Sequence, residues 1–133
     1  MPHLRYDHAA ELARVADMQG FARAMRDAMA ATGVFPVGGI RVRGHAASSE
    51  CTFDVGGDGT GDWLWLDMEL RMGRGRSEAE RQRVLAALYA AARAYLEPAV
   101  APRPFALSLE LREIDPAFSA KGWNTVHDAL ARR

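Results

Sequence analysis

The residue with the clearest chemical potential is Pro2, which directly follows the initiator methionine. If Met1 is removed, Pro2 becomes a secondary amine at the end of the chain, and such an amine can act as a base in proton transfer. A terminal amine has an ordinary pKa of about 7.7–8.0, and an apolar pocket or nearby guanidinium groups lower it. We expect the natively expressed protein to lack Met1, although a proline at this position also arises by chance.

Two arginines share one face of a predicted strand. In the segment VFPVGGIRVRGHA, Arg41 and Arg43 alternate with apolar residues, so both project from the same side. Arg76 stands just before a predicted helix, where the free backbone amides favour anions. The simplest alternative is that the first two are solvated strand charges and that Arg76 only supports the start of the helix.

The hydrophobic pattern predicts the strands that would position these residues. Alternation of apolar and polar residues indicates strands over about 2–8, 34–46, 63–72 and 105–114. Leu4 and Tyr6 would then share the core face of the first strand. The glycine-rich and aspartate-rich segment DVGGDGTGD is predicted to be a turn at 54–62. It is not expected to bind calcium, because one copy lacks the stacked neighbours that such sites need.

Two helices are also predicted. Apolar residues at helical spacing indicate a helix over 17–33, with Asp17 at its start and Gly33 at its end. A second helix begins after Ser77, which has the capping-box partner Glu80, and we expect Pro98 to stop it. The C-terminal residues GWNTVHDALARR indicate a short helical turn or two.

The order strand, helix, strand occurs twice in a predicted single domain, 1–133, with halves of about 1–60 and 61–120. A helix between two strands of one sheet favours a parallel pair. Two such units predict an α+β fold with four strands and both helices on one face. The other face carries arginines and tryptophans. It is too large to remain exposed to solvent in a monomer, so we expect copies of the same chain to cover it.

Composition excludes several classes of protein. The chain has 17 basic and 17 acidic residues and a net charge of zero, which argues against binding to nucleic acid or to an acidic membrane. No apolar run is long enough to span a bilayer. The start of the chain has no apolar signal region and Cys51 is the only cysteine, so we expect a cytoplasmic protein. The four histidines lack ligand spacing, and no metal site is expected.

Four segments carry a resemblance to a known family: MPH at the start, ATGVFPVGGIRVRGH at 31–45, GRGRSEAERQ at 73–82 and NTVH at 124–127. In this order and spacing, nearly end to end, the chain resembles 5-carboxymethyl-2-hydroxymuconate isomerase of the tautomerase superfamily. The resemblance implies a β-α-β-β-α-β fold with a mixed sheet. It also implies a homotrimer in which the sheets face inward.

The resemblance further implies an activity, the ketonisation of an anionic dienol with three carboxylates during homoprotocatechuate breakdown. It implies no metal and no organic cofactor. Pro2 would be the catalytic amine, while Arg41 and Arg76 would contact the anionic substrate, Arg41 also taking part in catalysis. Arg43 matches the second arginine of the family's basic strand and would join in binding.

The chain departs from the family pattern in two places. The first strand is more polar than usual, with Asp7 and His8 where smaller or apolar residues are expected, and the loop 46–61 diverges. These departures leave the exact dienol open.

Two alternatives to the isomerase remain at this stage. A related enzyme could hydrate or dehalogenate unsaturated acids, with protonated proline as the acid beside a carboxylate that activates water. Release of halide would distinguish that enzyme from an isomerase. The protein could also be a trimeric binding protein without activity, and a retained Met1 would be its signature because Pro2 would then be an amide.

Overall fold

The computed structural model describes residues 1–48 and 63–133. The strands in this part of the chain are β1 (His3–His8), β2 (Arg41–Ala46), β3 (Leu64–Gly73) and β4 (Phe105–Ile114). The helices are α1 (Leu12–Val15), α2 (Met18–Ala31), α3 (Glu78–Val100) and α4 (Val126–Ala131), with 3-10 helices η1 (Val37–Gly39) and η2 (Pro116–Phe118). The predicted turn at 54–62 and Cys51 lie outside the described residues.

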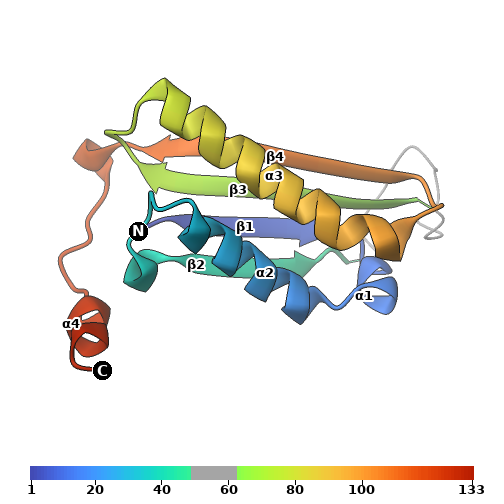
Figure 1. Ribbon diagram of the computed structural model, residues 1–133, viewed down its shortest axis with the longest axis horizontal. Coiled ribbons are helices and arrows are strands. Elements are labelled where there is room, and N and C mark those ends of the chain that lie inside the picture. The colour runs from blue at the N-terminus through green and yellow to red at the C-terminus, as the bar shows by residue number, and fades with distance from the viewer. Residues whose placement is uncertain (49–62) are drawn as a thin grey trace.

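The strands form one mixed sheet in the order β2-β1-β3-β4. β1 is parallel to β2 and β3 is parallel to β4, while β1 and β3 are antiparallel. Each parallel pair is connected through a helix, α2 or α3, and both helices lie on the same face of the sheet (Figure 1). The predicted α+β plan, a four-stranded mixed sheet with two helices on one face, is confirmed.

The core lies between the sheet and these two helices. The inward side chains of β3 are all buried, namely Leu64, Leu66, Met68, Leu70 and Met72. Phe21 of α2, Leu88 of α3 and Leu4 of β1 belong to the same buried cluster. Full burial of such a side chain contributes about 1.5–3 kcal/mol, so this alternation fixes which side of each strand faces outward.

The predicted helix ends are confirmed. The Asp17 carboxylate accepts a 2.9 Å hydrogen bond from the first turn of α2, and Gly33 follows the helix with φ 70°. At the start of α3, the Ser77 N–H donates to Glu80 Oε2 (3.0 Å) and the Glu80 N–H donates to Ser77 Oγ (3.2 Å). This capping box satisfies two amides that the helix itself cannot pair, and it fixes where the turn after β3 ends.

The prediction that Pro98 stops the second helix is wrong, because α3 continues to Val100. Pro98 has no N–H to donate to the carbonyl of Ala94, which removes one bond of the helix. The following turn still forms, since Val100 is buried in the core and the Ala101 N–H donates to the Glu97 carbonyl (3.1 Å). Packing of the last turn outweighs the lost bond.

Besides the short η2, two other elements were not predicted. Residues 37–39 form η1 instead of the start of a strand, so β2 begins only at Arg41. The single turn α1 follows β1 and is held by Leu12, which is completely buried. Neither has a hydrophobic period long enough to be recognised in the sequence.

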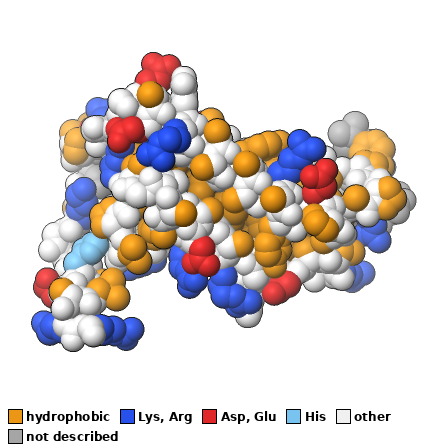
Figure 2. All heavy atoms as spheres, in the orientation of Figure 1, with side chains coloured by type: hydrophobic (Ala, Val, Ile, Leu, Met, Phe, Trp, Pro, Cys, Tyr) orange, Lys and Arg blue, Asp and Glu red, His pale blue; other side chains and the backbone are white. Residues whose placement is uncertain are grey.

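The C-terminal segment leaves the sheet after β4 and ends in α4, which lies beside η1 at the same end of the sheet as the N-terminus (Figure 1). Gly38 permits this contact, because a Cβ there would lie only 2.8 Å from Nδ1 of His127. The segment projects from the body of the molecule (Figure 2). Its Phe118 and Trp123 side chains are 91% and 93% exposed, so this chain alone gives them no partner surface.

Candidate active site

Pro2 is buried at the start of β1, near the point where the N-terminus, η1 and α4 meet (Figure 1). Its carbonyl accepts a hydrogen bond from the backbone N–H of Arg41 (3.1 Å), which joins it to β2. Gly39 approaches from another side, so that a Cβ there would lie 3.3 Å from Pro2 Cδ. While Met1 is attached, the Pro2 nitrogen is an amide, and it becomes basic only when Met1 is removed.

A cavity of about 230 Å³ lies beside Pro2. Its walls come from the N-terminus, the loop before η1, the turn between β3 and α3, and the C-terminal segment. Phe35 and Met72 provide apolar walls, whereas Arg76 and Lys121 provide positive charge. No acidic side chain is among the described residues that line it. The cavity therefore suits an anion with an unsaturated, apolar body.

Arg76 is held in this cavity by the turn that precedes α3. Gly75 has φ 111°, a conformation that favours glycine, and it directs the chain back toward the cavity. The Arg76 guanidinium donates to the carbonyls of Gly73 (3.1 Å) and Val34 (3.2 Å), and its central carbon lies 5.8 Å from the centre of the Phe35 ring. Within the described part of the chain no carboxylate pairs with it, so its charge remains available to a ligand.

Arg41 and Arg43 are placed differently. They lie on β2, and the register puts Arg41 opposite His3 on the face of the sheet that the helices leave open. Arg41 Nη1 donates to the carbonyls of Gly38 (3.0 Å) and Ile40 (2.7 Å). Neither arginine lines the cavity at Pro2. The structure thus brings Arg76 to Pro2, holds Arg41 against the loop before β2, and leaves Arg43 exposed.

Burial and cations lower the pKa of basic groups at this end of the sheet. The pKa of the Met1 amino group lies below 8.0 because of burial first, and then because of the positive charges of Lys121, Arg76 and Arg71. The pKa of His3 lies below 6.5, again because of burial first and then because of neighbouring arginines and the chain terminus. An amine at this end of the chain is thus held neutral more easily than in water.

The sequence interpretation missed three residues beside Pro2, namely His3, Arg71 and Lys121. Arg71 continues the outward alternation of β3, and the pairing of β1 with β3 places it opposite His3. That alternation was a usable signal for Arg71. No sequence pattern indicated that Lys121 belongs to the site, because its position depends on the path of the segment after β4.

The mixed β-α-β-β-α-β sheet with both helices on one face is a tautomerase-like fold. A family model described as 5-carboxymethyl-2-hydroxymuconate isomerase matches residues 2–130. The chain belongs to this family.

Named relatives agree with this assignment. The chain is 32% identical over 127 residues to the 5-carboxymethyl-2-hydroxymuconate Delta-isomerase of Escherichia coli, covering 96% of this chain and 97% of that protein. A crystal structure of a 5-carboxymethyl-2-hydroxymuconate delta-isomerase matches with a TM-score of 0.82 and 32% identity, over 98% of this chain and 93% of the other. The crystal structure of a 5-carboxymethyl-2-hydroxymuconate isomerase from Deinococcus radiodurans R1 matches with a TM-score of 0.81 and 26% identity, over 96% of this chain and 93% of the other.

More distant structures share only the fold. Two fused 4-OT proteins, 15% and 16% identical to this chain, are symmetric trimers with TM-scores of 0.61 and 0.66. A member of the cis-3-chloroacrylic acid dehalogenase family is 13% identical, with a TM-score of 0.63. Among the described helices, none is long and apolar enough to cross a membrane.

Proposed function

We propose that this protein is a cofactor-independent enol–keto isomerase acting on 5-carboxymethyl-2-hydroxymuconate or a similar unsaturated polycarboxylate. The observation that carries the proposal is the cavity at Pro2, which combines apolar walls with Arg76 and Lys121 and has no acidic side chain among its described lining. Family membership over residues 2–130 supports the same substrate class. In this proposal the working form of the protein begins at Pro2.

The proposed reaction moves one proton from oxygen to carbon. The neutral Pro2 amine takes the proton of the enol hydroxyl, the O–H electron pair forms the C=O bond, and the conjugated double bonds shift. The far carbon of the dienolate then takes a proton from the Pro2 ammonium group, which restores the amine. The rigid proline ring fixes the direction of the lone pair, so less freedom is lost when the substrate binds.

Arg76 is proposed to stabilise the oxygen on which negative charge develops. Its planar guanidinium can bind a carboxylate or an enolate through two donors and keeps its charge at any working pH. Because the cavity is partly shielded from water, this charge acts more strongly than it would at an open surface. Arg41 and Arg43 are proposed as further substrate contacts, Arg41 also in catalysis, across the edge that β2 presents.

The assembly proposed for this function is a homotrimer in the cytoplasm, with the open sheet faces turned inward. The large charged face opposite the helices supports the association, as do the trimers seen for distant relatives of the same fold. Such packing would place Arg41 and Arg43, on the open face of β2, near the neighbouring copies.

A hydratase or dehalogenase on the same amine is the second candidate within this fold. That chemistry needs a carboxylate to activate water, and the described lining of the Pro2 cavity contains no carboxylate. The isomerase is therefore favoured. The other candidate, a trimeric binding protein without activity, depends on Met1 remaining attached.

The test is ultraviolet-monitored ketonisation of 5-carboxymethyl-2-hydroxymuconate by protein whose mass shows that it begins at Pro2. We expect fast turnover, and a clear loss in kcat for Pro2→Ala, because the primary amine that replaces proline is not held in a fixed direction by a ring. No turnover by the correctly processed protein, or full activity in Pro2→Ala, would overturn the proposal. A native mass that includes Met1 would favour the binding protein, and halide release from halogenated acrylates would favour the dehalogenase.

A further inference from the structure

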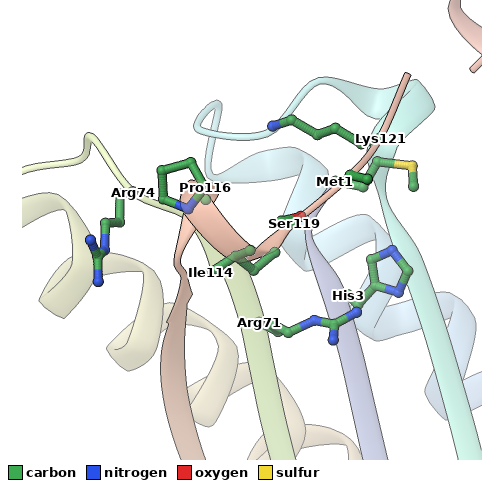
Figure 3. A pocket seen from close by; sticks show the side chains of 10 residues that line it. Met1, His3, Arg71, Arg74, Ile114, Pro116, Ser119 and Lys121 are labelled. Atoms are coloured by element: carbon green, nitrogen blue, oxygen red, sulfur yellow. The ribbon is translucent and has the colours of Figure 1, made fainter. Parts of the chain in front are cut away.

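A second cavity, of about 300 Å³, lies on the open side of the sheet next to Pro2. It is lined by His3 and Arg71 from two neighbouring strands and by Ser119 and Lys121 from the C-terminal segment (Figure 3). Met1, Gly73, Arg74 and Lys121 line both this cavity and the one beside Pro2. The two cavities are therefore neighbours, and removal of Met1 takes away part of the wall that they share.

The second cavity contains positive charge that nothing in the described chain balances. The side chains of Arg71 and Lys121 form no hydrogen bond or ion pair with any described residue, and no acidic residue is part of the described lining. The nearby Arg74, by contrast, is paired with Glu113 (3.9 Å) and Asp115 (3.4 Å). Figure 3 shows the Arg71 guanidinium reaching toward His3, with Lys121 across the opposite side of the cavity. Two unpaired cations facing one space favour an anion there.

His3 adds an unsatisfied polar atom to this site. Its Nδ1 atom is buried and has no hydrogen-bond partner among the described residues. Burial, together with Arg43, Arg71, the chain terminus and Arg41, lowers the pKa of His3, so the ring is neutral at pH 7. A neutral imidazole offers one donor and one acceptor nitrogen. The neutral ring therefore adds no charge to the cavity, whose unpaired positive charge comes from Arg71 and Lys121.

We propose that Arg71, Lys121 and His3 form a second carboxylate subsite, which holds the carboxymethyl arm of the substrate while the enol end lies at Pro2 and Arg76. This inference rests on the proposed function for the identity of the substrate. The subsite selects diacids that carry a third carboxylate on a flexible side arm over diacids without one. Lys121 lies on the wall between the cavities and contacts both parts of such a ligand.

The test separates binding from catalysis by using two unreactive acids that differ only in this arm. These are 2-(carboxymethyl)hexanedioate, the saturated carbon skeleton of the substrate, and hexanedioate. Calorimetric titration of protein that begins at Pro2 is expected to give about tenfold tighter binding of the tricarboxylate, the strength of one charge-assisted contact. Arg71→Gln and Lys121→Gln are each expected to bring the ratio of the two affinities, tricarboxylate to hexanedioate, close to one.

Arg112→Gln is the matched control. Arg112 is opposite Arg71 on β4, but it is paired with Glu69 (3.1 Å) and Glu110 (3.3 Å) and lines neither cavity. It should keep the wild-type ratio. Chromatography of each variant checks that the assembly is unchanged, so a lost ratio cannot reflect a lost partner copy.

The outcomes distinguish the two proposals. If the tricarboxylate has no advantage in the wild type, or if Arg71→Gln and Lys121→Gln keep the advantage, the subsite is wrong even when the enzyme turns over. If the ratio behaves as expected but the dienol is not converted, the subsite stands and the isomerase assignment fails. In an active enzyme, at a pH well above the pKa of the Pro2 amine, Arg71→Gln should raise KM for 5-carboxymethyl-2-hydroxymuconate with little effect on kcat, and should raise KM for 2-hydroxymuconate much less.

Discussion

At the scale of the residue, the proposed chemistry depends on how easily one amine loses its proton. Pro2 shares its cavity with Arg76 and Lys121, and the cations that lower the pKa of the Met1 amino group are Lys121, Arg76 and Arg71. If Met1 is removed, as proposed, the Pro2 amine lies in the cavity that Arg76 and Lys121 line. Because nearby positive charges disfavour the protonated form of an amine, we expect the pKa of the Pro2 amine to lie below that of an ordinary terminal amine.

A pH profile tests this account. The neutral amine is the active form, so kcat/KM should rise with pH and level off above the pKa of Pro2, with a midpoint below the ordinary value of 8.0. Lys121→Gln removes one nearby positive charge, which should move the midpoint to higher pH. The control is Arg103→Gln, an exposed cation outside this cavity. A midpoint that stays in place, or that moves down in Lys121→Gln, would contradict the account.

At the scale of the element, the turn between β3 and α3 positions the site. Arg76 links this turn to the loop before η1 through its bond to the Val34 carbonyl, and Arg83 on α3 makes a similar link to the Thr32 carbonyl (3.2 Å). Both arginines thus link α3 or the turn before it to the segment after α2, and Arg76 has a second hydrogen bond, to the Gly73 carbonyl. Only Arg76 also lines the cavity at Pro2.

This pair provides a matched comparison of structure and catalysis. Arg83→Gln should lower the free energy of unfolding by about 0.5–1.5 kcal/mol, because it loses one partly buried hydrogen bond, and Arg76→Gln should lower it by more, because it loses two. Only Arg76→Gln should also lower kcat/KM, by about 100-fold to 1,000-fold, as expected for loss of a group that stabilises developing charge. Thermal unfolding and ketonisation rates measure the two effects. Equal losses of activity in both variants would reduce Arg76 to a structural role.

The elements also show what sequence patterns can and cannot predict. Strand alternation and the capping box at Ser77 are patterns of residues close together in the sequence. They correctly predicted which face of the sheet is buried and where α3 starts. The prediction that Pro98 ends α3 was wrong, because the burial of Val100, a tertiary contact, offsets the lost backbone hydrogen bond. Pro2 and Arg76 were candidates from their positions in the sequence, and the resemblance added their roles. Arg71 and Lys121 require the register of β1 with β3 and the course of the C-terminal segment. Neither is encoded by a local period.

At the scale of the whole molecule, the charge of the open sheet face changes along the strands, from basic near Pro2 to acidic farther away. The row nearest Pro2 is basic, running from Arg41 through His3 and Arg71 to Arg112. The next row joins Arg43 and Arg5 to Glu69 and Glu110, and the third joins His45 and Asp7 to Asp67 and Ser108. A face with positive and negative ends can match a rotated copy of itself, which supports assembly through this surface.

The proposed assembly can be tested by reversing one charge on the open face of the sheet and, as a control, one charge on the helix side. The wild type, with a chain mass of 14.6 kDa, should elute with the light-scattering mass of three chains. Asp67→Arg reverses a charge in the middle of the open face and should break the assembly, since an unmatched charge buried at an interface costs several kcal/mol. Asp27→Arg, on the exposed side of α2, should leave it intact. A monomeric wild type, or a trimer that tolerates Asp67→Arg, would mean that copies of the chain do not cover this face.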